Sequence, residues 1–163
     1  MSDVQALFTD YAAYHQTKGN KAFHRLGIPL IVLSLLGMLS RLYWTASWSL
    51  DVGGIAGLHI IDAATIFIIA ATIYYFVIEW RLAIPMFLVL VIFYVAGVKL
   101  PFWINVALFI LGWIFQFVGH SVYEHKQPAF LKNFLHLLVG PLWILNDLVP
   151  VVKAPLNISS EAR

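Results

Sequence analysis

The sequence predicts an all-α, polytopic membrane protein: a helix bundle with four to five membrane segments and an N-terminal amphipathic helix at the membrane interface. Hydrophobic residues make up 61% of the 163 residues and charged residues only 11%, against about 45–50% and about 25% in a soluble domain. The mean hydropathy is +0.85. A soluble domain of this size has too little interior to bury so much apolar surface, which excludes that class.

Five apolar stretches are candidates for crossing the membrane, since about 17–25 apolar residues are needed for one span. The candidates are Leu26 to Leu39 with an extension to about Trp44, about Ile55 to Ile78, Leu82 to Val98, Phe102 to Val118, and about Phe134 to Val152. Short connections between neighbouring stretches predict antiparallel helical hairpins. The fifth stretch contains Pro141 and Pro150, so crossing, re-entrant and interfacial arrangements all stay open for it.

The N-terminal stretch is expected to form the interfacial helix. The apolar residues that follow helical spacing there are Val4, Leu7, Phe8, Tyr11 and Tyr14. Gly19 is expected to end this helix, and Asn20 to cap the next one. Residues 1–153 are predicted to form a single membrane-embedded domain, followed by a polar C-terminal tail at residues 154–163.

The distribution of Lys and Arg predicts the orientation. With a cytoplasmic N-terminus, the inner segments hold Lys18, Lys21, Arg25, Arg81, Lys126 and Lys132, and the outer loops hold Arg41 and Lys99. This excess favours a cytoplasmic N-terminus, in the inner (cytoplasmic) membrane of a bacterium or the endoplasmic reticulum of a eukaryote. The net charge of +2 is too small for a nucleic-acid-binding module, and the absence of cysteine excludes disulfides and thiolate metal sites.

This orientation brings most of the histidines to one membrane face, although they come from both ends of the chain. His59 is expected near the opposite face. The histidines on the cytoplasmic side are His15, His24, His120, His125 and His136. We expect His125, which lies one step off the polar stripe described next, to face solvent.

Polar residues on the cytoplasmic side have helical spacing. Gln116, His120 and Glu124 follow one another at intervals of four and form one stripe on a helix. Asn20 and His24 have the same interval. Because such side chains are costly when they face lipid, we expect them to face the bundle interior or a wet cavity.

Neutral imidazoles together with a carboxylate suit Fe(2+), with open positions left for oxygen and substrate. The candidate metal ligands are His15, His24, His120, Glu124 and His136. Glu124 has an alternative role, in which it orients a ligating imidazole through its other ring nitrogen. Taken one at a time, an interfacial histidine is more usually a hydrogen-bonding anchor than a metal ligand.

Three further polar residues are candidate catalytic or substrate-binding residues beside Glu124. Gln116 and Asn20 are neutral donors suited to holding a bound carboxylate or a histidine tautomer. Arg25 directly follows His24, and pairing with a substrate carboxylate or snorkelling to the interface explains it equally well.

A second function class stays open at this point, a small membrane transporter for a metal ion or a proton. Asp62, Asn105 and Asp147 fall in or near membrane segments, and such residues often mark transport pathways. Against this class, the polar groups gather at one face and the sequence contains no inverted repeat.

The motifs at the two ends of the chain resemble the 2-hydroxy fatty acid dioxygenase family. The matching positions are Tyr14, His15, Asn20, His24 and Pro29, then GWIFQFVGH at 112–120, Glu124, Pro128, Ala129, Asn133 and Pro141. The resemblance spans most of the chain, although the middle segments match only as apolar sequence. His125 and His136 depart from it, since a fungal member has Lys and Gln at those positions.

The resemblance implies an Fe(II)-dependent α-oxidation, in which a long-chain 2-hydroxy fatty acid and O₂ give the fatty acid one carbon shorter and CO₂. It implies that His15, His24 and His120 hold the metal, and that Glu124 is a ligand or a nearby base. It also fits a membrane helix bundle, because an acyl chain can lie among apolar helices while its polar head reaches the interface.

Overall fold

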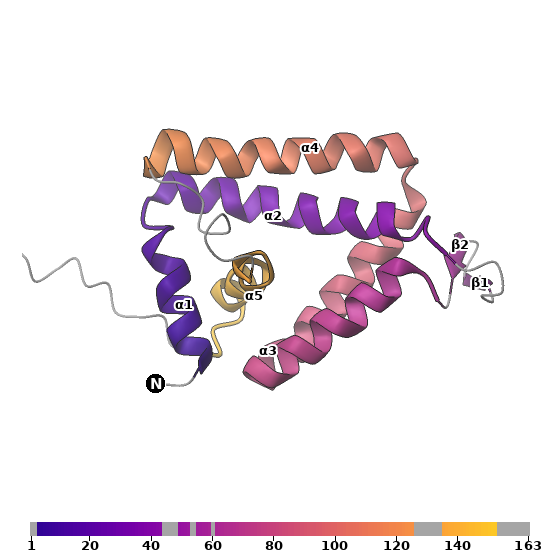
Figure 1. Ribbon diagram of the computed structural model, residues 1–163, viewed down its shortest axis with the longest axis horizontal. Helices are drawn as coiled ribbons and strands as arrows, with labels where there is room; N and C mark the ends of the chain where they lie inside the picture. The colour runs from indigo at the N-terminus through magenta and orange to yellow at the C-terminus, as the bar shows by residue number, and fades with distance from the viewer. Residues whose placement is uncertain (1–2, 44–48, 53–54, 60, 126–134, 153–163) are drawn as a thin grey trace, which may run out of the picture.

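The computed structural model is a helix bundle with a small β-hairpin (Figure 1). It describes residues 3–43, 49–52, 55–59, 61–125 and 135–152. The elements are α1 (Asp3–Ala13), α2 (Lys18–Leu39), β1 (Ser49–Val52), β2 (Ile55–His59), α3 (Ala63–Lys99), α4 (Phe102–Val118), the π-helix η1 (Gly119–Glu124) and α5 (His136–Leu148). The expected all-α bundle is confirmed. The tail predicted at 154–163 lies outside the described residues.

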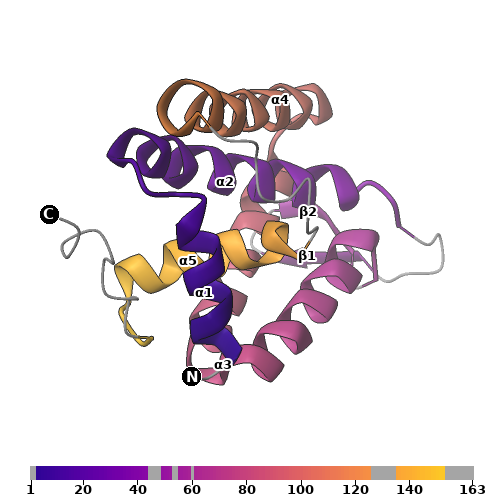
Figure 2. The same ribbon diagram turned by 60° about the vertical axis from the view of Figure 1, so that its left-hand side comes forward.

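Helix α1 closes one end of the bundle and crosses over α5 (Figure 2). The spacing of Val4, Phe8 and Tyr11 places all three on one face, and all three are buried. The amphipathic pattern therefore docks α1 onto the rest of the protein. The helix ends at Ala13, so the expectation that Gly19 ends it was wrong.

Helix α2 begins at a cap that the sequence reading placed wrongly. The N-cap is Thr17, whose hydroxyl accepts a hydrogen bond from the backbone N–H of Asn20. Gly19 lies in the first turn, where a Cβ atom would stand 2.1 Å from the ring of Tyr123. The helix ends at Leu39 and does not continue to residue 44 as expected.

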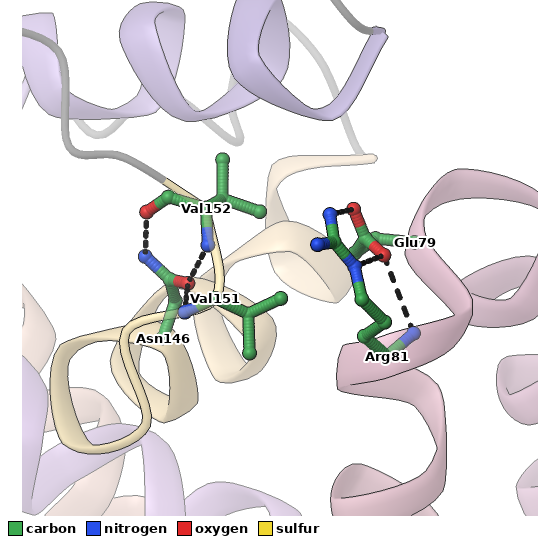
Figure 3. Close-up of polar contacts among 5 residues, drawn as sticks. All are labelled: Glu79, Arg81, Asn146, Val151 and Val152. Atoms are coloured by element: carbon green, nitrogen blue, oxygen red, sulfur yellow. Dashed lines mark hydrogen bonds and ion pairs between the residues drawn. The ribbon is translucent and has the colours of Figure 1, made fainter.

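Helix α3 is folded back on itself. Its 37 residues would extend about 56 Å as a straight helix, well beyond the ~30 Å of a bilayer's hydrocarbon core. Glu79 has non-helical backbone angles (φ −159°, ψ 95°), and its carboxylate accepts hydrogen bonds from Arg81, with the Nε–Oε1 distance at 2.8 Å (Figure 3). The hydroxyl of Tyr94 donates to Asp62 Oδ2 at 2.5 Å and joins the two ends. The two antiparallel halves correspond to the second and third predicted spans.

The start of the second predicted span needs correction. No helix begins at Ile55, because residues 55–59 form strand β2, which pairs antiparallel with β1. The helix begins only at Ala63. Asp62 caps it: the carboxylate accepts the N–H of Thr65, and the Thr65 hydroxyl accepts the N–H of Asp62. This capping box sets the N-terminal end of α3, which hydrophobicity alone does not predict.

Helices α2 and α4 lie antiparallel and side by side (Figure 1, Figure 2). Glycines allow the close approach: a Cβ atom on Gly27 would lie 2.4 Å from Nε2 of Gln116, and one on Gly119 would lie 2.6 Å from Oδ1 of Asn20. Small residues at such an interface are typical of helix packing in membranes. The contact brings the start of α2 against the junction of α4 and η1.

The polar stripe of Gln116, His120 and Glu124 does not lie on one continuous α-helix. The α-helix ends at Val118, and π-helix η1 carries His120 and Glu124 until His125, in the left-handed region at φ 52°, ends it. All three side chains of the stripe are nevertheless buried, as predicted. A π-helical turn inside a helix is frequent at functional sites.

Three helical stretches in the described part of the chain are long and apolar enough to cross a membrane: α2, α3, and α4 with η1. Helix α5 has 13 residues, about 20 Å, which is too short to span and favours the re-entrant or interfacial alternatives for the fifth stretch. Asn146 ties down the chain after α5, because its Oδ1 accepts N–H bonds from Val151 and Val152 and its Nδ2 donates to the Val152 carbonyl (Figure 3).

Candidate metal centre

Three imidazoles from distant parts of the sequence meet in the interior. His15 lies between α1 and α2, His24 on the second turn of α2, and His120 in η1. Their ring centroids are 4.4–4.9 Å apart, and each residue is about 2% exposed. Each offers one ligand atom within 4.8 Å of the other two, and among the described residues no other group of three or more His, Cys, Asp or Glu side chains does so.

Hydrogen bonds set which nitrogen of each ring is available. Nδ1 of His15 lies 2.6 Å from the Tyr11 carbonyl and Nδ1 of His24 lies 3.0 Å from the Asn20 carbonyl, so each Nδ1–H donates and each Nε2 keeps its lone pair. Nε2 of His15 and Nδ1 of His120 are buried and have no hydrogen-bond partner within the described part of the chain. Unpartnered buried nitrogens are costly, and a transition-metal ion would satisfy them, so the residues fit such an ion.

The chemical state of His15 favours metal binding. Burial lowers its pKa to about 4, which leaves the ring neutral at pH 7 with its lone pair free. The ring is also held in place by Tyr11, which stacks on it at a centroid distance of 4.0 Å with planes 11° apart. Tyr11 is itself buried, and burial raises the pKa of its hydroxyl.

Glu124 does not belong to the group of three, and it is bound to the loop that carries His15. Its carboxylate accepts hydrogen bonds from the N–H groups of Gln16 (3.0 Å) and Thr17 (3.1 Å) and from the Thr17 hydroxyl (3.0 Å). It also accepts one from Nδ2 of Asn20 at 3.2 Å, and the same Nδ2 donates to the Tyr14 carbonyl. The side chains of Glu124 and Asn20 therefore fix the loop backbone, and the nitrogen of His24 that is not available to a metal is bonded by the backbone carbonyl of Asn20.

A long apolar cavity of about 670 Å³ opens from the three histidines into the bundle. Along α2 it is lined from His24 to Leu35, which are separated by a helical rise of about 16 Å. On the other side it is lined from His120 in η1 back to Phe109 in α4. Its lining among the described residues contains no Lys, Arg, Asp or Glu. The other residues around it include Ile28, Ile31, Val32, Phe67, Tyr75, Leu90, Trp113, Leu138 and Pro141.

The structure places Gln116 and Arg25, two of the three further candidates, in different surroundings. Gln116 lines the cavity one turn before His120. Its Nε2 is buried and no described residue accepts a hydrogen bond from it, so a donor is available there. Arg25 is instead exposed and donates to Asp147 at 2.8 Å, and it does not line the cavity. The pairing with Asp147 accounts for Arg25 without a substrate.

The remaining histidines occupy different settings. His136 is buried and lines the cavity, but it stands outside the group of three, and its Nε2 lies 2.8 Å from Oδ2 of Asp10. His125 is exposed, as expected. Strand β2, which ends at His59, lies beyond the far end of α2 from the metal centre (Figure 1), in agreement with the predicted separation.

The sequence reading missed the partners of the histidines. Tyr11 is four residues before His15, an interval that could have predicted their contact, although α1 ends between them. Trp143 packs 5.4 Å from Tyr11, and Asp10 bonds a residue 126 positions away, so neither contact leaves a pattern in the sequence.

The residues that motivated the transport alternative have structural partners. Asp62 caps α3 and bonds Tyr94, Nδ2 of Asn105 donates to the Gly97 carbonyl at 2.9 Å, and Asp147 pairs with Arg25. The structure thus uses these groups at helix ends and helix contacts.

The fold and the site define a class, a helical membrane protein with a candidate transition-metal centre at one end of a cavity shaped for an apolar chain. Residues 1–150 match the family described as 2-hydroxy-palmitic acid dioxygenase Mpo1-like, and the chain belongs to this family. It is 27% identical over 172 aligned residues to 2-hydroxy-palmitic acid dioxygenase MPO1 of Saccharomyces cerevisiae, covering 99% of this chain and 91% of the yeast protein. No solved structure matches the chain.

Proposed function

We propose that this protein is an Fe(II)-dependent dioxygenase that shortens long-chain 2-hydroxy fatty acids by one carbon. The observation that carries the proposal is the meeting of three buried imidazoles at the end of an apolar cavity. The family and the yeast relative support the same substrate class. Imidazole ligands suit iron among the transition metals, and bound Fe(II) would supply the binding and activation of O₂.

The reaction balances without an organic cosubstrate. A 2-hydroxy acid R–CH(OH)–COOH and O₂ give R–COOH, CO₂ and H₂O, so the bond between C1 and C2 breaks and C2 is oxidised to a carboxyl carbon. His15, His24 and His120 hold the metal in this proposal. The loop held by Glu124 and Asn20 keeps His15 in position.

The cavity residues bind and orient the substrate. Each methylene of the acyl chain that leaves water for the apolar cavity contributes about 0.8 kcal/mol. Gln116 donates its Nε2–H to the substrate carboxylate, since that group is buried and has no acceptor among the described residues. The cavity also excludes water from the reacting carbons and aligns them with the metal end.

A location within the membrane suits an enzyme that acts on an apolar substrate. A long-chain hydroxy acid dissolves in the lipid leaflet, so an enzyme within the bilayer meets it at high local concentration. We propose a cytoplasmic N-terminus on the basis of the Lys and Arg distribution, with the metal centre at the cytoplasmic rim.

Product analysis tests the proposed reaction. The full-length protein, purified in detergent and loaded anaerobically with Fe(II), should convert 2-hydroxypalmitate and O₂ to the 15-carbon acid with one CO₂ per O₂ consumed. Palmitate is the matched control and should give no product. Metal-dependent ion flux in liposomes, together with no conversion of 2-hydroxypalmitate, would instead establish the transport alternative.

The depth of the cavity is expected to set the preferred chain length. Leu35 lines the deep end, so Leu35→Trp should favour 2-hydroxylaurate over 2-hydroxypalmitate in competition assays. Each methylene that the larger ring displaces lowers the affinity roughly fourfold, from about 0.8 kcal/mol per methylene. Leu88→Trp is the matched control because Leu88 is 56% exposed on the outer face of α3. An unchanged preference in Leu35→Trp would mean that the chain does not reach this depth.

A further inference from the structure

A second polar group lines the cavity beside the three histidines: His136, which is hydrogen-bonded to Asp10 outside the lining. His136 begins α5 and lines the cavity, and Asp10 lies on α1. The His136 side chain is only 4% exposed, whereas that of Asp10 is 58% exposed. The pair therefore runs from the protein surface to the cavity wall.

The hydrogen bond to Asp10 determines what the ring offers to the cavity. When Nε2–H of His136 donates to the carboxylate at 2.8 Å, the neutral ring carries its lone pair on Nδ1. Nδ1 is buried and has no hydrogen-bond partner among the residues that the structure describes. A buried acceptor without a donor is costly, so a ligand that supplies the donor would gain specifically from this position.

We propose that Asp10 and His136 form the recognition site for the 2-hydroxyl group of the substrate, with Nδ1 of His136 accepting the hydroxyl hydrogen. This inference rests on the proposed substrate class. At neutral pH the carboxylate of such a substrate accepts only and its chain is apolar, so the 2-hydroxyl is its one hydrogen-bond donor. The carboxylate matches the donor Gln116, and the hydroxyl matches the acceptor His136.

The arrangement explains how the site distinguishes hydroxylated from ordinary fatty acids. A plain fatty acid leaves Nδ1 of His136 unpaired in an apolar cavity, and a site built to bond a hydroxyl rejects an analogue that lacks it. His136 is in this proposal a specificity-determining residue, and Asp10 a positioning residue that fixes its tautomer. Neither role requires His136 to bind the metal.

A comparison of binding constants tests the proposal independently of turnover. Trp113 lines the cavity, so quenching of its fluorescence reports ligand binding. The dissociation constants of 2-hydroxypalmitate and palmitate are measured on the full-length protein in detergent. Each is measured with and without Fe(II) under anaerobic conditions. His136→Phe should lower the preference for the hydroxylated acid by roughly 3- to 10-fold, the worth of one hydrogen bond. The affinity for palmitate and the iron content should stay unchanged.

Asp10→Ala, at an exposed position on α1, should lower the preference in the same direction and by a smaller factor. Asp147→Ala is the matched control, an exposed acid whose partner Arg25 lies outside the cavity lining, and it should leave the preference as in the unmodified protein. An unchanged preference in His136→Phe would overturn the proposal. Loss of iron from that variant would overturn it too, since His136 would then be a ligand. Because binding is measured without turnover, failure of the proposed reaction would be seen separately in product analysis.

Discussion

His24→Ala is expected to abolish both stable iron binding and turnover of 2-hydroxypalmitate. The ring of His24 is buried, and its centroid lies 4.4 Å from that of His15 and 4.8 Å from that of His120. Changes in residues that only support metal ligands cost about 10- to 100-fold in metal affinity or activity, so loss of a ligand should exceed about 100-fold. Elemental analysis gives the iron-to-protein ratio, and oxygen consumption gives the rate.

The control for this experiment is a histidine of the same region that stands outside the metal centre. His125 is exposed and has a positive φ of 52°, a conformation that asparagine tolerates, so His125→Asn removes an imidazole without straining the backbone. It should retain iron and activity. If His24→Ala kept the iron content and rate of the unmodified protein, the three histidines would not be the metal centre.

Glu124→Ala is expected to weaken iron binding about 10- to 100-fold and to lower thermal stability, although we place Glu124 outside the metal ligands. The substitution leaves the N–H groups of Gln16 and Thr17 without their acceptor, at roughly 1–3 kcal/mol for each donor that stays buried. The loop that carries His15 then loses its anchor on η1. Iron titration and thermal unfolding of the full-length protein measure the two effects.

Two further variants separate the loop role of Glu124 from a ligand role. Glu124→Gln keeps one oxygen for the loop N–H groups and should lie between the unmodified protein and Glu124→Ala. Thr17→Val removes the hydroxyl that donates to Oε2 of Glu124 at 3.0 Å, and it should weaken iron binding in the same direction. Full iron affinity in Glu124→Ala would contradict the anchoring role.

The hydrophobicity of the sequence predicts where most of the long helices lie, but it predicts their first and last residues less well. The spans expected at 82–98 and 102–118 lie within α3 and α4 almost to the residue, because long apolar runs have one solution in a bilayer. The run from Ile55 was read as the start of a span, yet residues 55–59 form a strand. A short apolar run is compatible with either structure, and the choice there depends on pairing with residues 49–52 and on the cap at Asp62.

The candidate site was partly predictable because the membrane topology, unlike the tertiary contacts, follows from the sequence. The distribution of Lys and Arg predicts an orientation that puts His15, His24 and His120 at one membrane face. The structure brings these three residues together. The role of Glu124 was not predictable, because it depends on the backbone of a loop 108 positions away. The Asp10–His136 contact depends likewise on how α1 crosses α5, which no local pattern encodes.

The distribution of the three histidines along the chain has a consequence for biosynthesis. His15 and His24 emerge early from the ribosome, whereas His120 follows only after α3 and α4 have been made. A nascent chain that holds only the first two lacks one of the three proposed ligands, so the proposed metal centre would be completed only when the C-terminal half has been inserted beside α2. Translation products that stop before residue 120 should accordingly carry no tightly held iron.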